Sequence, residues 1–436
     1  MNAQPVITPA MTPERAGEIA ASFDLRALPS DFYANPYPVY ALLRETEPVK
    51  RMPDGSYFLT RYADLVQVYR DAGCFSSDKK VEFTPKFAGS AGSNGAVPPL
   101  LEHHTTSLVF NDPPLHTRVR KLIMGALTRR AIADLEPGLG VLVDALLDRI
   151  ESQGGGDLVE DFACAIPVEI IGNLLGVPHA DRAPLRGWSL AILGALEPRL
   201  TAQQEALGNR SVTEFTGYLG ELVAQRRKTP GDPEHDVLTR LIQGEAAGER
   251  LSESELLQNC VFILNAGHET TTNLIGNALV ALQEWPAQKA ALLAAIGQSP
   301  ADSPALQAQL DCAVDEFLRF ESSNQLGNRR ALRSCEVGGV RLDQGALVTL
   351  CIAAANRDPA QFAQPDLLDL RRENNRHLAF GFGIHQCAGL SLARLEGRVA
   401  VGRFLRRFPR YRLAAPPVRG GRARFRGFLH APFALA

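Results

Sequence analysis

A single cysteine in a glycine-containing loop is the residue of this chain best placed to do chemistry. Cys387 lies in the sequence HLAFGFGIHQCAGLSLARLE, in which Gly381 and Gly383 permit tight backbone geometry. A pattern of helical period follows and runs up to Pro409. The start of a helix favours a thiolate there, because the helix end is positive and its backbone N–H groups are free. The alternative is a buried structural cysteine, the usual state of a lone cysteine.

A second group of polar residues lies in the middle of a long apolar segment. A capping box at Ser252 and Glu255 opens this segment and Pro286 ends it, which predicts a helix of about 33 residues, roughly 50 Å long. The flanks are apolar on most faces, so we expect the helix to be buried. Its centre is polar nevertheless and contains Asn265, His268, Glu269, Thr270, Thr271 and Thr272. Polar groups in such a place need partners or a function.

Local chemistry offers two interpretations of this polar centre. Thr270 can donate a hydrogen bond to the carbonyl group of Ala266, and Gly267 lowers the helix preference and lets a ligand approach. A local bulge is therefore expected there. The alternative is a threonine cluster that only bonds to its own backbone.

Two further pairs of residues are spaced to meet on one helical face. His116 and Arg120 follow a Pro-Pro pair and stand one turn apart. In the sequence DEFLRF, Glu316 and Arg319 are three residues apart, and their apolar neighbours indicate that this helix is buried.

The composition is that of an ordinary globular protein. The 436 residues are 45% hydrophobic and 22% charged, and the net charge of −2 gives no overall attraction to nucleic acid or to an anionic membrane. The amino terminus lacks the charged start and apolar core of a signal peptide, and no run approaches about 20 apolar residues, so we expect no membrane anchor. The chain has seven cysteines, Cys74, Cys164, Cys260, Cys312, Cys335, Cys351 and Cys387. Their spacing matches no zinc site, which fits a reducing cytoplasm.

The periodicity predicts a mainly α chain with small peripheral β-sheets and no internal repeats. Residues 1–21 are expected to be a flexible lead-in to a single domain of residues 22–436. A strand is predicted at 56–60, and further strand signals lie at 337–354 and in the tail. Residues 76–110 are rich in Gly, Ser and Pro and predict a long mobile loop, or else a surface insertion without a function.

The ordered series HTRVR, AGHETT, E-x-x-R, AANRDP and FGFGIHQCAG is similar to the soluble bacterial cytochromes P450, over essentially the whole chain after about residue 30. The resemblance implies the cytochrome P450 fold, with haem b (iron protoporphyrin IX) held between the long central helix and the cysteine loop. It makes residues 22–436 the catalytic domain and Cys387 the thiolate ligand of the iron, which favours cleavage of the O–O bond.

The resemblance also assigns haem contacts to residues outside the central helix. Contacts with the two propionates are implied for His116, Arg120, Arg329 and His385, with Arg330 as an alternative to Arg329. Phe380 would pack on the sulfur side of the haem, and Gly389 belongs to the same loop. Glu316, Arg319 and Arg372 match the buried structural triad of the family.

On the other side of the haem, Ala266, Gly267, Glu269 and Thr270 match the oxygen-activating segment of the family. Thr270 would position a water and hydrogen-bond the bound oxygen, and Glu269 would link this relay to solvent. Two departures stand out. The proline common shortly after E-x-x-R is absent from FESSNQLGNR, and His268, whose counterparts vary, receives no role.

The function implied is a haem-thiolate monooxygenase that inserts one oxygen atom from O2 into a small, largely apolar organic substrate. The pocket is expected to include residues 76–110, helices near 180–215 and the surroundings of Ile263, Leu326 and Phe428. One alternative is a peroxide-driven peroxygenase, against which the acid–alcohol pair on the central helix argues. The other is a non-enzymatic haem-thiolate sensor, which would need no such pair.

Electrons are expected from NAD(P)H by way of a ferredoxin reductase and a separate acidic ferredoxin. Basic residues gather in the two helices expected on the cysteine side of the haem: Arg118, Lys121, Arg129, Arg130, Arg394, Arg398, Arg403, Arg406 and Arg407. They predict a docking patch for the ferredoxin, unless they are only the solvated faces of two amphipathic helices. The protein is expected to be a cytoplasmic monomer without nucleic-acid or membrane partners.

Overall fold

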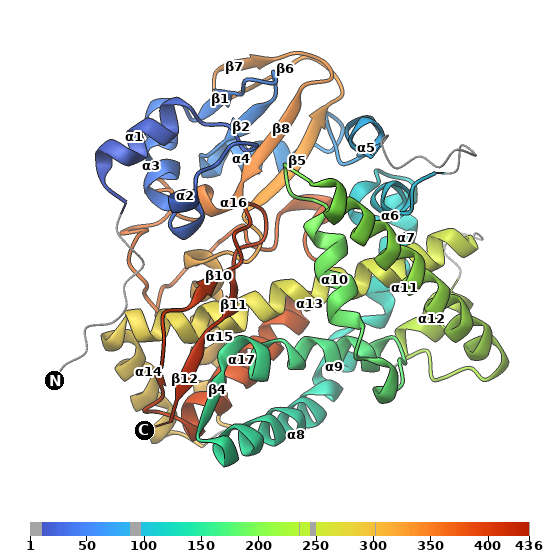
Figure 1. The fold of residues 1–436 in the computed structure, drawn as a ribbon, viewed down its shortest axis with the longest axis vertical. Coiled ribbons are helices and arrows are strands. Elements are labelled where there is room, and N and C mark those ends of the chain that lie inside the picture. Colours follow the sequence, from blue (N-terminus) through green and yellow to red (C-terminus); the bar gives the residue numbers. More distant parts are fainter. Residues whose placement is uncertain (1–10, 88–96, 235, 245–249, 301, 436) are drawn as a thin grey trace. The chain divides into compact units, whose positions relative to one another are not determined.

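The computed structural model describes residues 11–87, 97–234, 236–244, 250–300 and 302–435, and these residues form a mostly helical fold with small sheets, as predicted (Figure 1). The chain divides into two compact units, each built from separate segments. Unit 1 comprises Met1–Phe75, Glu136–Ile166 and Thr270–Ala436, and unit 2 comprises Ser76–Leu135 and Pro167–Glu269. The division falls within strand β3 (Phe75–Ser76) and within three helices, α8 (Arg129–Gln153), α9 (Ala165–Leu174) and α13 (Glu253–Glu284). The single domain expected for residues 22–436 stays a prediction.

The main sheet of unit 1 combines strands from both ends of the chain. Its order is β1-β2-β8-β5-β3, with β1 (Val49–Arg51), β2 (Tyr57–Leu59), β8 (Leu347–Cys351), β5 (Leu326–Ala331) and β3 (Phe75–Ser76). Strand β2 runs parallel to β8, and β5 runs antiparallel to β8. The smaller sheets pair β6 (Cys335–Val337) with β7 (Val340–Leu342), β10 (Val418–Arg419) with β11 (Phe428–His430), and β12 (Pro432–Ala434) with β4 (Gly155–Asp157) and β9 (Arg412–Leu413).

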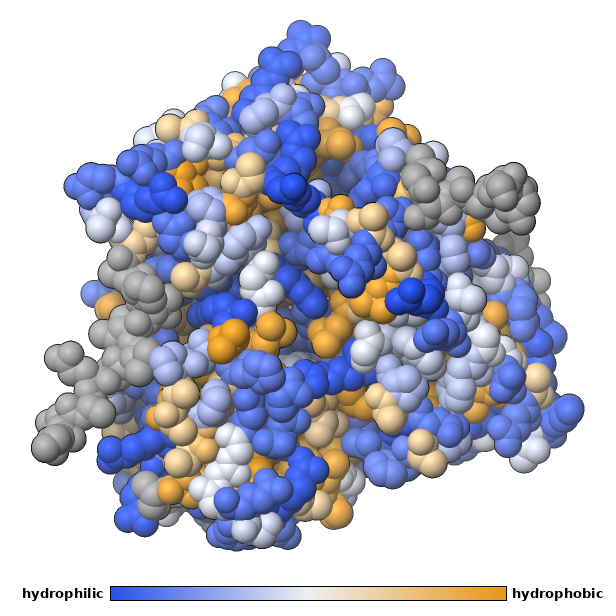
Figure 2. Space-filling model, viewed as in Figure 1, coloured by the Kyte–Doolittle hydropathy of each residue, from blue (hydrophilic) through white to orange (hydrophobic). Residues whose placement is uncertain are grey.

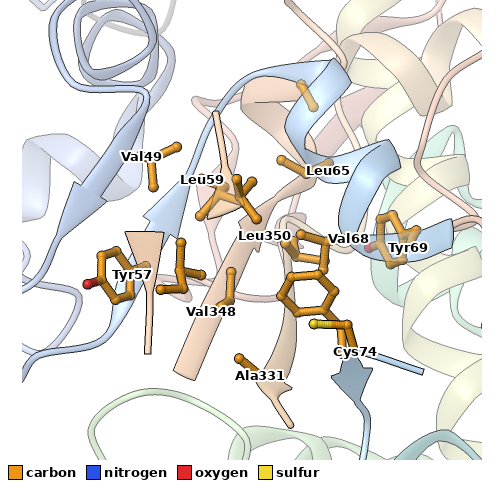
Figure 3. Close-up of a cluster of buried hydrophobic side chains, with 14 of the residues drawn as sticks. Val49, Tyr57, Leu59, Leu65, Val68, Tyr69, Cys74, Ala331, Val348 and Leu350 are labelled. Atoms are coloured by element: carbon orange, nitrogen blue, oxygen red, sulfur yellow. The ribbon is translucent and has the colours of Figure 1, made fainter. Parts of the chain in front are cut away.

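The helices of unit 1 cover these sheets and pack against one another. They are α1 (Pro13–Ala21), α2 (Ser30–Ala34), α3 (Tyr37–Thr46), α4 (Tyr62–Arg70), α14 (Pro286–Gln298), α15 (Pro304–Phe320), α16 (Ile352–Ala355) and α17 (Leu390–Arg407), with the π-helical segment η3 (Leu158–Ala163) and the 3-10 turn η5 (Gly383–His385). Figure 3 shows one of the cores, in which Leu65 and Val68 of α4 lie against Val348 and Leu350 of β8. These side chains are at most 1% exposed, so the strand and the helix share one dry interface.

Unit 2 is helical. Apart from its parts of α8, α9 and α13, it contains α5 (Lys80–Lys86), α6 (Pro99–Thr106), α7 (Leu115–Ala126), α10 (Leu185–Gly194), α11 (Ala202–Lys228) and α12 (Val237–Gln243), with the 3-10 turns η2 (Leu108–Phe110) and η4 (His179–Asp181). A capping box at Thr201 and Gln204 fixes the start of α11. Leu100 of α6 packs on Gly208 of α11, which has no side chain to keep the two helices apart.

The amino-terminal expectation was wrong in part. Residues 13–21 form α1 rather than a flexible lead-in, with Thr12 as the N-cap whose hydroxyl accepts the N–H of Arg15. Ala16, Ile19 and Ala20 are buried in a core with residues of α2 and α3. Residues 1–10 lie outside the described residues.

The long mobile loop predicted for residues 76–110 was also wrong in part. Residues 80–86 form α5, residues 99–106 form α6 and residues 108–110 form η2. Phe83, Phe87 and Phe110 surround the ring of His104, and this aromatic cluster gives a segment without clear periodicity a core of its own. The Gly- and Ser-rich residues 88–96 lie outside the described residues.

The long central helix is confirmed in its span and its start. The backbone N–H of Glu255 donates to the hydroxyl of Ser252 (3.1 Å), and the N–H of Ser252 donates to the carboxylate of Glu255 (2.8 Å). The bulge expected near Gly267 is absent, since α13 is a regular α-helix from Glu253 to Glu284. Among the described residues no helix is long and apolar enough to cross a membrane. Hydrophilic and hydrophobic side chains are mixed over the face shown in Figure 2.

Candidate functional site

The cysteine loop has the compact geometry that its glycines predicted. The backbone N–H of Cys387 donates to the carbonyl oxygen of Phe380 (2.8 Å) and closes the loop. Gly381 and Gly383 adopt φ values of +64° and +72°, the left-handed region that favours glycine. Helix α17 follows with Gly389 as its N-cap. The thiol group is therefore placed just before the positive end of a helix.

Tyr69 of α4 positions this loop, and the sequence analysis missed it. A Cβ atom at Gly383 would lie 2.4 Å from the carbonyl oxygen of Tyr69, so only glycine permits the approach. The ring of Tyr69 also faces the guanidinium group of Arg329 on β5, 5.2 Å from the ring centre. One residue thus contacts the cysteine loop and the strand that carries a predicted propionate ligand. Its helix has an ordinary amphipathic pattern, so no local signal marks it.

The cysteine loop fits a flat apolar cofactor. None of the residues from 379 to 390 is buried in the described chain, although they include Phe380, Phe382 and Ile384. Phe380 and Phe382 are half-buried and Ile384 is 38% exposed, so part of this apolar surface is open to a partner or a ligand. A cysteine within that loop could ligate a metal at the centre of such a ligand. His385 lies in η5 of the same loop.

Strand β5 places the two candidate arginines side by side. Arg329 pairs with Val348 in the register of β5 and β8, and Arg330 pairs with Leu347. Because successive residues of a strand point to opposite faces, only one of the two can face a given ligand. Arg329 donates to the carbonyl oxygen of Asn328 (2.8 Å) as well as facing the Tyr69 ring.

The E-x-x-R pair forms the buried ion cluster that was predicted. Arg319 donates twice to the carboxylate of Glu316, each time at 2.8 Å, and both side chains are 0% exposed. Arg372 donates to the same carboxylate at 3.0 Å. Arg319 also bonds the carbonyl oxygens of Asn356 and Pro365, so the cluster ties α15 to the segment that leads into the cysteine loop. The triad of Glu316, Arg319 and Arg372 is confirmed.

One face of the middle of α13 is incompletely buried. Residues on this face recur at intervals of three or four and are Phe262, Ile263, Ala266, Gly267 and Thr270. The predicted residues Ala266, Gly267 and Thr270 therefore share a face that can border a ligand. Glu269 is 6% exposed and lies on the adjoining buried side.

Gly267 has a role that the sequence did not predict. A Cβ atom there would lie 2.3 Å from Cδ1 of Ile171 on α9, so that side of the glycine is occupied by packing between two helices of unit 2. We had expected the glycine to admit a ligand. The contact with Ile171 is non-local in sequence, and no motif could have shown it.

The predicted residues of α7 lie in unit 2. His116 is 2% exposed, and Arg120 lies one turn further along on the same side of the helix. Pro114 is the N-cap and the helix begins at Leu115, as the Pro-Pro signal indicated. Cys387, Phe380, His385, Gly389, Arg329 and Thr270 belong to unit 1, whereas His116, Arg120, Ala266, Gly267 and Glu269 belong to unit 2.

The sequence analysis also did not predict a buried hydrogen-bond network in unit 2. Nδ1 of His103 lies 2.9 Å from Oε1 of Gln258, which can only accept, so this nitrogen carries the proton. Nε2 of His103 is then the acceptor for the amide of Asn265 at 3.5 Å. Burial lowers the pKa of His103 to about 4, so the imidazole stays neutral near pH 7. The hydrogen bond to His103 stabilises the side-chain amide of Asn265 in its buried position beside Ala266.

Glu396 is a buried acid on the helix that follows the cysteine. It is 2% exposed, and Oε1 has no hydrogen-bond partner among the described residues. Burial raises its pKa to about 8, and a hydrogen bond from Thr271 opposes this shift. The group therefore holds a proton near neutral pH. No sequence pattern predicts this protonated state, because Glu396 lies within an otherwise basic helix.

The basic residues of α17 are offset by acids of unit 1. We call the contact between α8 and α17 the charged seam; its ion pairs join Arg398 to Glu136, Arg403 to Asp144, and Arg407 to Asp148 and Glu151. Arg394 pairs with Asp315 of α15 at 2.7 Å. In unit 2, Arg118 pairs with Glu255. The positive charge predicted on α17 is thus largely offset by acids of unit 1.

Comparison with known proteins identifies the family. A family model described as Cytochrome P450 matches residues 196–413. The chain is 37% identical to Cytochrome P450 107B1 of Saccharopolyspora erythraea, over 90% of this chain and 93% of that protein. This chain belongs to the cytochrome P450 family. It is also 37% identical to the vitamin D(3) 25-hydroxylase of Pseudonocardia autotrophica, over 88% of this chain and 89% of that protein.

A solved structure supports the same assignment. P450BioI, in complex with an acyl carrier protein ligated to hexadec-9Z-enoic acid, matches this cytochrome P450 with a TM-score of 0.84 and 30% identity, over 93% of this chain and 99% of that chain. The protein is a cytochrome P450 monooxygenase with haem b as its cofactor. As a member of this family it binds an organic substrate and O2 and depends on a redox partner.

Proposed function

We propose that Cys387 is the proximal ligand of the haem iron. The observation that carries this proposal is the closed, incompletely buried loop of residues 379–390, with its left-handed glycines and its position before α17. When bound, the haem supplies an iron at which oxygen is activated and the substrate oxidised. The N-terminus of α17 favours the anionic form of the thiol, and Phe380 packs on the sulfur side.

Cationic and imidazole groups hold the haem propionates in this proposal. Their residues are His116, Arg120, Arg329 and His385. Two carboxylates beside an apolar ring need such partners, because burying them without donors costs several kcal/mol each. The contact between Tyr69 and Arg329 supports the choice of Arg329 over Arg330, since it restrains one guanidinium group beside the cysteine loop.

Thr270 and Glu269 form the proton relay. Thr270 lies on the incompletely buried face of α13, where its hydroxyl group can hold a water and pass a proton through it. Glu269 follows on the neighbouring buried side, where it can pass protons from solvent. Ala266 and the backbone of Gly267 would border the haem in this proposal, while the Cα of Gly267 packs against Ile171 of α9. This acid–alcohol pair favours oxygen-driven monooxygenation over a peroxygenase or a sensor.

The substrate is a small, largely apolar organic molecule, and the electrons come from NAD(P)H through a ferredoxin reductase and an acidic ferredoxin. The similarity to a vitamin D(3) 25-hydroxylase supports an apolar substrate. Phe262 and Ile263, which share the face of Thr270, are apolar in agreement with this. The cytoplasmic location and the monomeric state inferred from the sequence belong to the same proposal.

Replacing Cys387 with His tests the ligand. The reduced carbonyl complex of the native protein should show the red-shifted band of thiolate ligation, and Cys387→His should lose it while keeping the helical circular dichroism. Cys312→Ser is a matched control that should retain the band, because Cys312 only donates a weak hydrogen bond to the carbonyl oxygen of Arg372. A band that survives in Cys387→His would remove the assignment.

Replacing Thr270 with Ala tests the relay. Haem content and substrate binding should be unchanged, but electrons should be diverted to hydrogen peroxide, so that product formed per NAD(P)H falls about tenfold or more. Thr272→Ala is the control on the buried side of the same helix. An unchanged product yield in Thr270→Ala would place the relay elsewhere.

A further inference from the structure

Asp315 on α15 connects three segments of unit 1 next to the cysteine loop. Its Oδ1 atom accepts a hydrogen bond from Nε of Arg394 on α17 at 2.7 Å and lies 3.3 Å from Nε2 of His377, which precedes the loop. The side chains of Asp315 and Arg394 are 25% and 32% exposed, and that of His377 is 2% exposed. We call these three residues the Asp315 cluster.

The hydrogen bonds of His377 determine its protonation state. The backbone N–H of Ala379 donates to Nδ1 of His377 at 3.2 Å, so this nitrogen carries no proton. Nε2 therefore carries the proton and donates it to Asp315, and the imidazole is neutral. Burial would raise the pKa of Asp315, but the hydrogen bonds from His377 and Arg394 lower this pKa below its usual value. Asp315 is thus the anion of the cluster and Arg394 is its cation.

Both partners of Asp315 also contact the ring of Phe380. The guanidinium carbon of Arg394 lies 5.0 Å from the centre of this ring, and the ring of His377 lies 5.6 Å from it, centre to centre. The carbonyl oxygen of Phe380 in turn accepts the backbone N–H of Cys387 at 2.8 Å. Asp315 therefore acts on the cysteine loop through two side chains and without touching Cys387 itself.

The position of Arg394 makes its charge important for this loop. Helix α17 begins at Leu390 and has no acid in its first turn. A cation close to this end of a helix is unfavourable, because the free backbone N–H groups there are already positive. Among the described residues, Asp315 is the acid that forms an ion pair with Arg394. The negative charge that offsets Arg394 beside the loop thus comes from α15.

We propose that Asp315 is a positioning residue for reduction of the haem: it holds Arg394 and His377 against Phe380 and offsets the Arg394 cation beside the thiolate. This inference rests on the proposal that Cys387 ligates the iron. Reduction adds one electron from the redox partner, and therefore one negative charge, to the haem–thiolate site. A nearby cation without its counter-charge favours the reduced form, and a nearby anion without its counter-charge opposes it.

Variants of the haem-containing protein that change one charge test this balance. Asp315→Asn keeps the shape and an acceptor oxygen but leaves Arg394 without its anion. At a fixed applied potential, the ratio of ferrous to ferric haem in this variant should rise several-fold above the native ratio. Arg394→Gln leaves the anion without its cation, so the ratio should fall several-fold. The double variant removes both charges and should return close to the native ratio. Spectroelectrochemical titration measures all four proteins.

Two control variants isolate the local charge. Arg394→Lys keeps the cation and should stay near the native ratio, so its comparison with Arg394→Gln decides the sign even if Asp315→Asn does not retain haem. Asp144→Asn removes the acid paired with Arg403, which lies about 13 Å further along α17 than Arg394. This variant has the same change of net charge as Asp315→Asn and should shift the ratio much less.

The band of the reduced carbonyl complex separates this inference from the proposal on which it rests. Native protein without the red-shifted band would remove Cys387 as the ligand. If the band is present, shifts of the same sign in Asp315→Asn and Arg394→Gln, or no shift in either, would overturn the role of Asp315, because a purely structural role does not give opposite shifts. An Asp144→Asn shift as large as that of Asp315→Asn would overturn it as well, since overall charge would then explain the effect.

Discussion

Glu316 on α15 and Glu396 on α17 are buried carboxyl groups of unit 1, 0% and 2% exposed, with opposite surroundings. Glu316 accepts hydrogen bonds from Arg319 and Arg372, and the backbone N–H of Asp369 donates to it as well (2.9 Å). Glu396 has the hydroxyl of Thr271 as a hydrogen-bond partner, and burial raises its pKa to about 8. Two acids of equal burial therefore act as a structural anion and as a neutral acid.

The charged seam extends this comparison to the surface. Arg403 and Arg407 are 43% and 40% exposed, and their acidic partners are at least 50% exposed. Water screens such pairs, so each contributes little to the free energy of unfolding. Acidic residues of unit 1 thus occur in three settings: in a buried ion cluster, as a buried neutral acid, and in exposed ion pairs. Burial and the presence of a cationic partner decide which setting each acid has.

The largest effect is expected at the buried ion cluster. Glu316→Gln leaves Arg319 buried without its counter-charge and should lower the free energy of unfolding by about 3–5 kcal/mol. Haem incorporation should fall in parallel, because Arg319 also ties α15 to Asn356 and Pro365. Urea unfolding and haem content per chain measure both. The control is Asp311→Asn, where the acid is 45% exposed. Equal stability of the two variants would break the comparison.

Glu396→Gln should raise the free energy of unfolding, whereas Glu316→Gln lowers it, and the size of this increase should depend on pH. Below pH 4.5 the carboxyl is protonated in both the folded and the unfolded state. Between pH 4.5 and 8 only the folded state keeps the proton, so native stability falls as pH rises and levels off above pH 8. The glutamine variant lacks this pH dependence. Between pH 5 and pH 8 its free energy of unfolding should therefore rise by about 3 kcal/mol relative to that of the native protein. Parallel stability curves over this range would show that Glu396 is ionised when folded.

Substitutions in the charged seam should change the free energy of unfolding only slightly. Asp144→Asn removes the partner of Arg403 and should change the free energy of unfolding by at most about 1 kcal/mol, with less effect at high salt. Thermal unfolding at two salt concentrations is sufficient to measure it. A loss as large as that of Glu316→Gln would mean that the seam is desolvated in solution.

The smallest effect concerns the redox partner. Lys121 is exposed and forms no ion pair with the described residues, whereas Arg403 is paired with Asp144. Lys121→Glu should slow reduction by an acidic ferredoxin a few-fold at low salt, and Arg403→Gln should slow it less. Stopped-flow reduction across a salt series compares them. A reduction rate that changes neither with salt concentration nor with either substitution would exclude the basic docking patch.

Much of the candidate site follows from local sequence. Two glycines before Cys387, a capping box at Ser252 and Glu255, and an arginine three residues after Glu316 each act within one loop, one helix end or one helical turn. Such signals fix the cysteine loop, the span of α13 and the buried ion pair. They depend on backbone sterics and helical periodicity, which the sequence carries without knowledge of its neighbours.

The remaining features were decided by contacts between segments far apart in the chain. Ile171 fills the space beside Gly267, and Tyr69 contacts both Gly383 and Arg329. The acids of α8 that offset the arginines of α17 lie more than 200 residues away in sequence. Composition and spacing alone determined which groups can carry charge or bind a metal. Only the tertiary structure decided which of them are buried, paired or neutral, because burial and pairing depend on what other segments bring beside them.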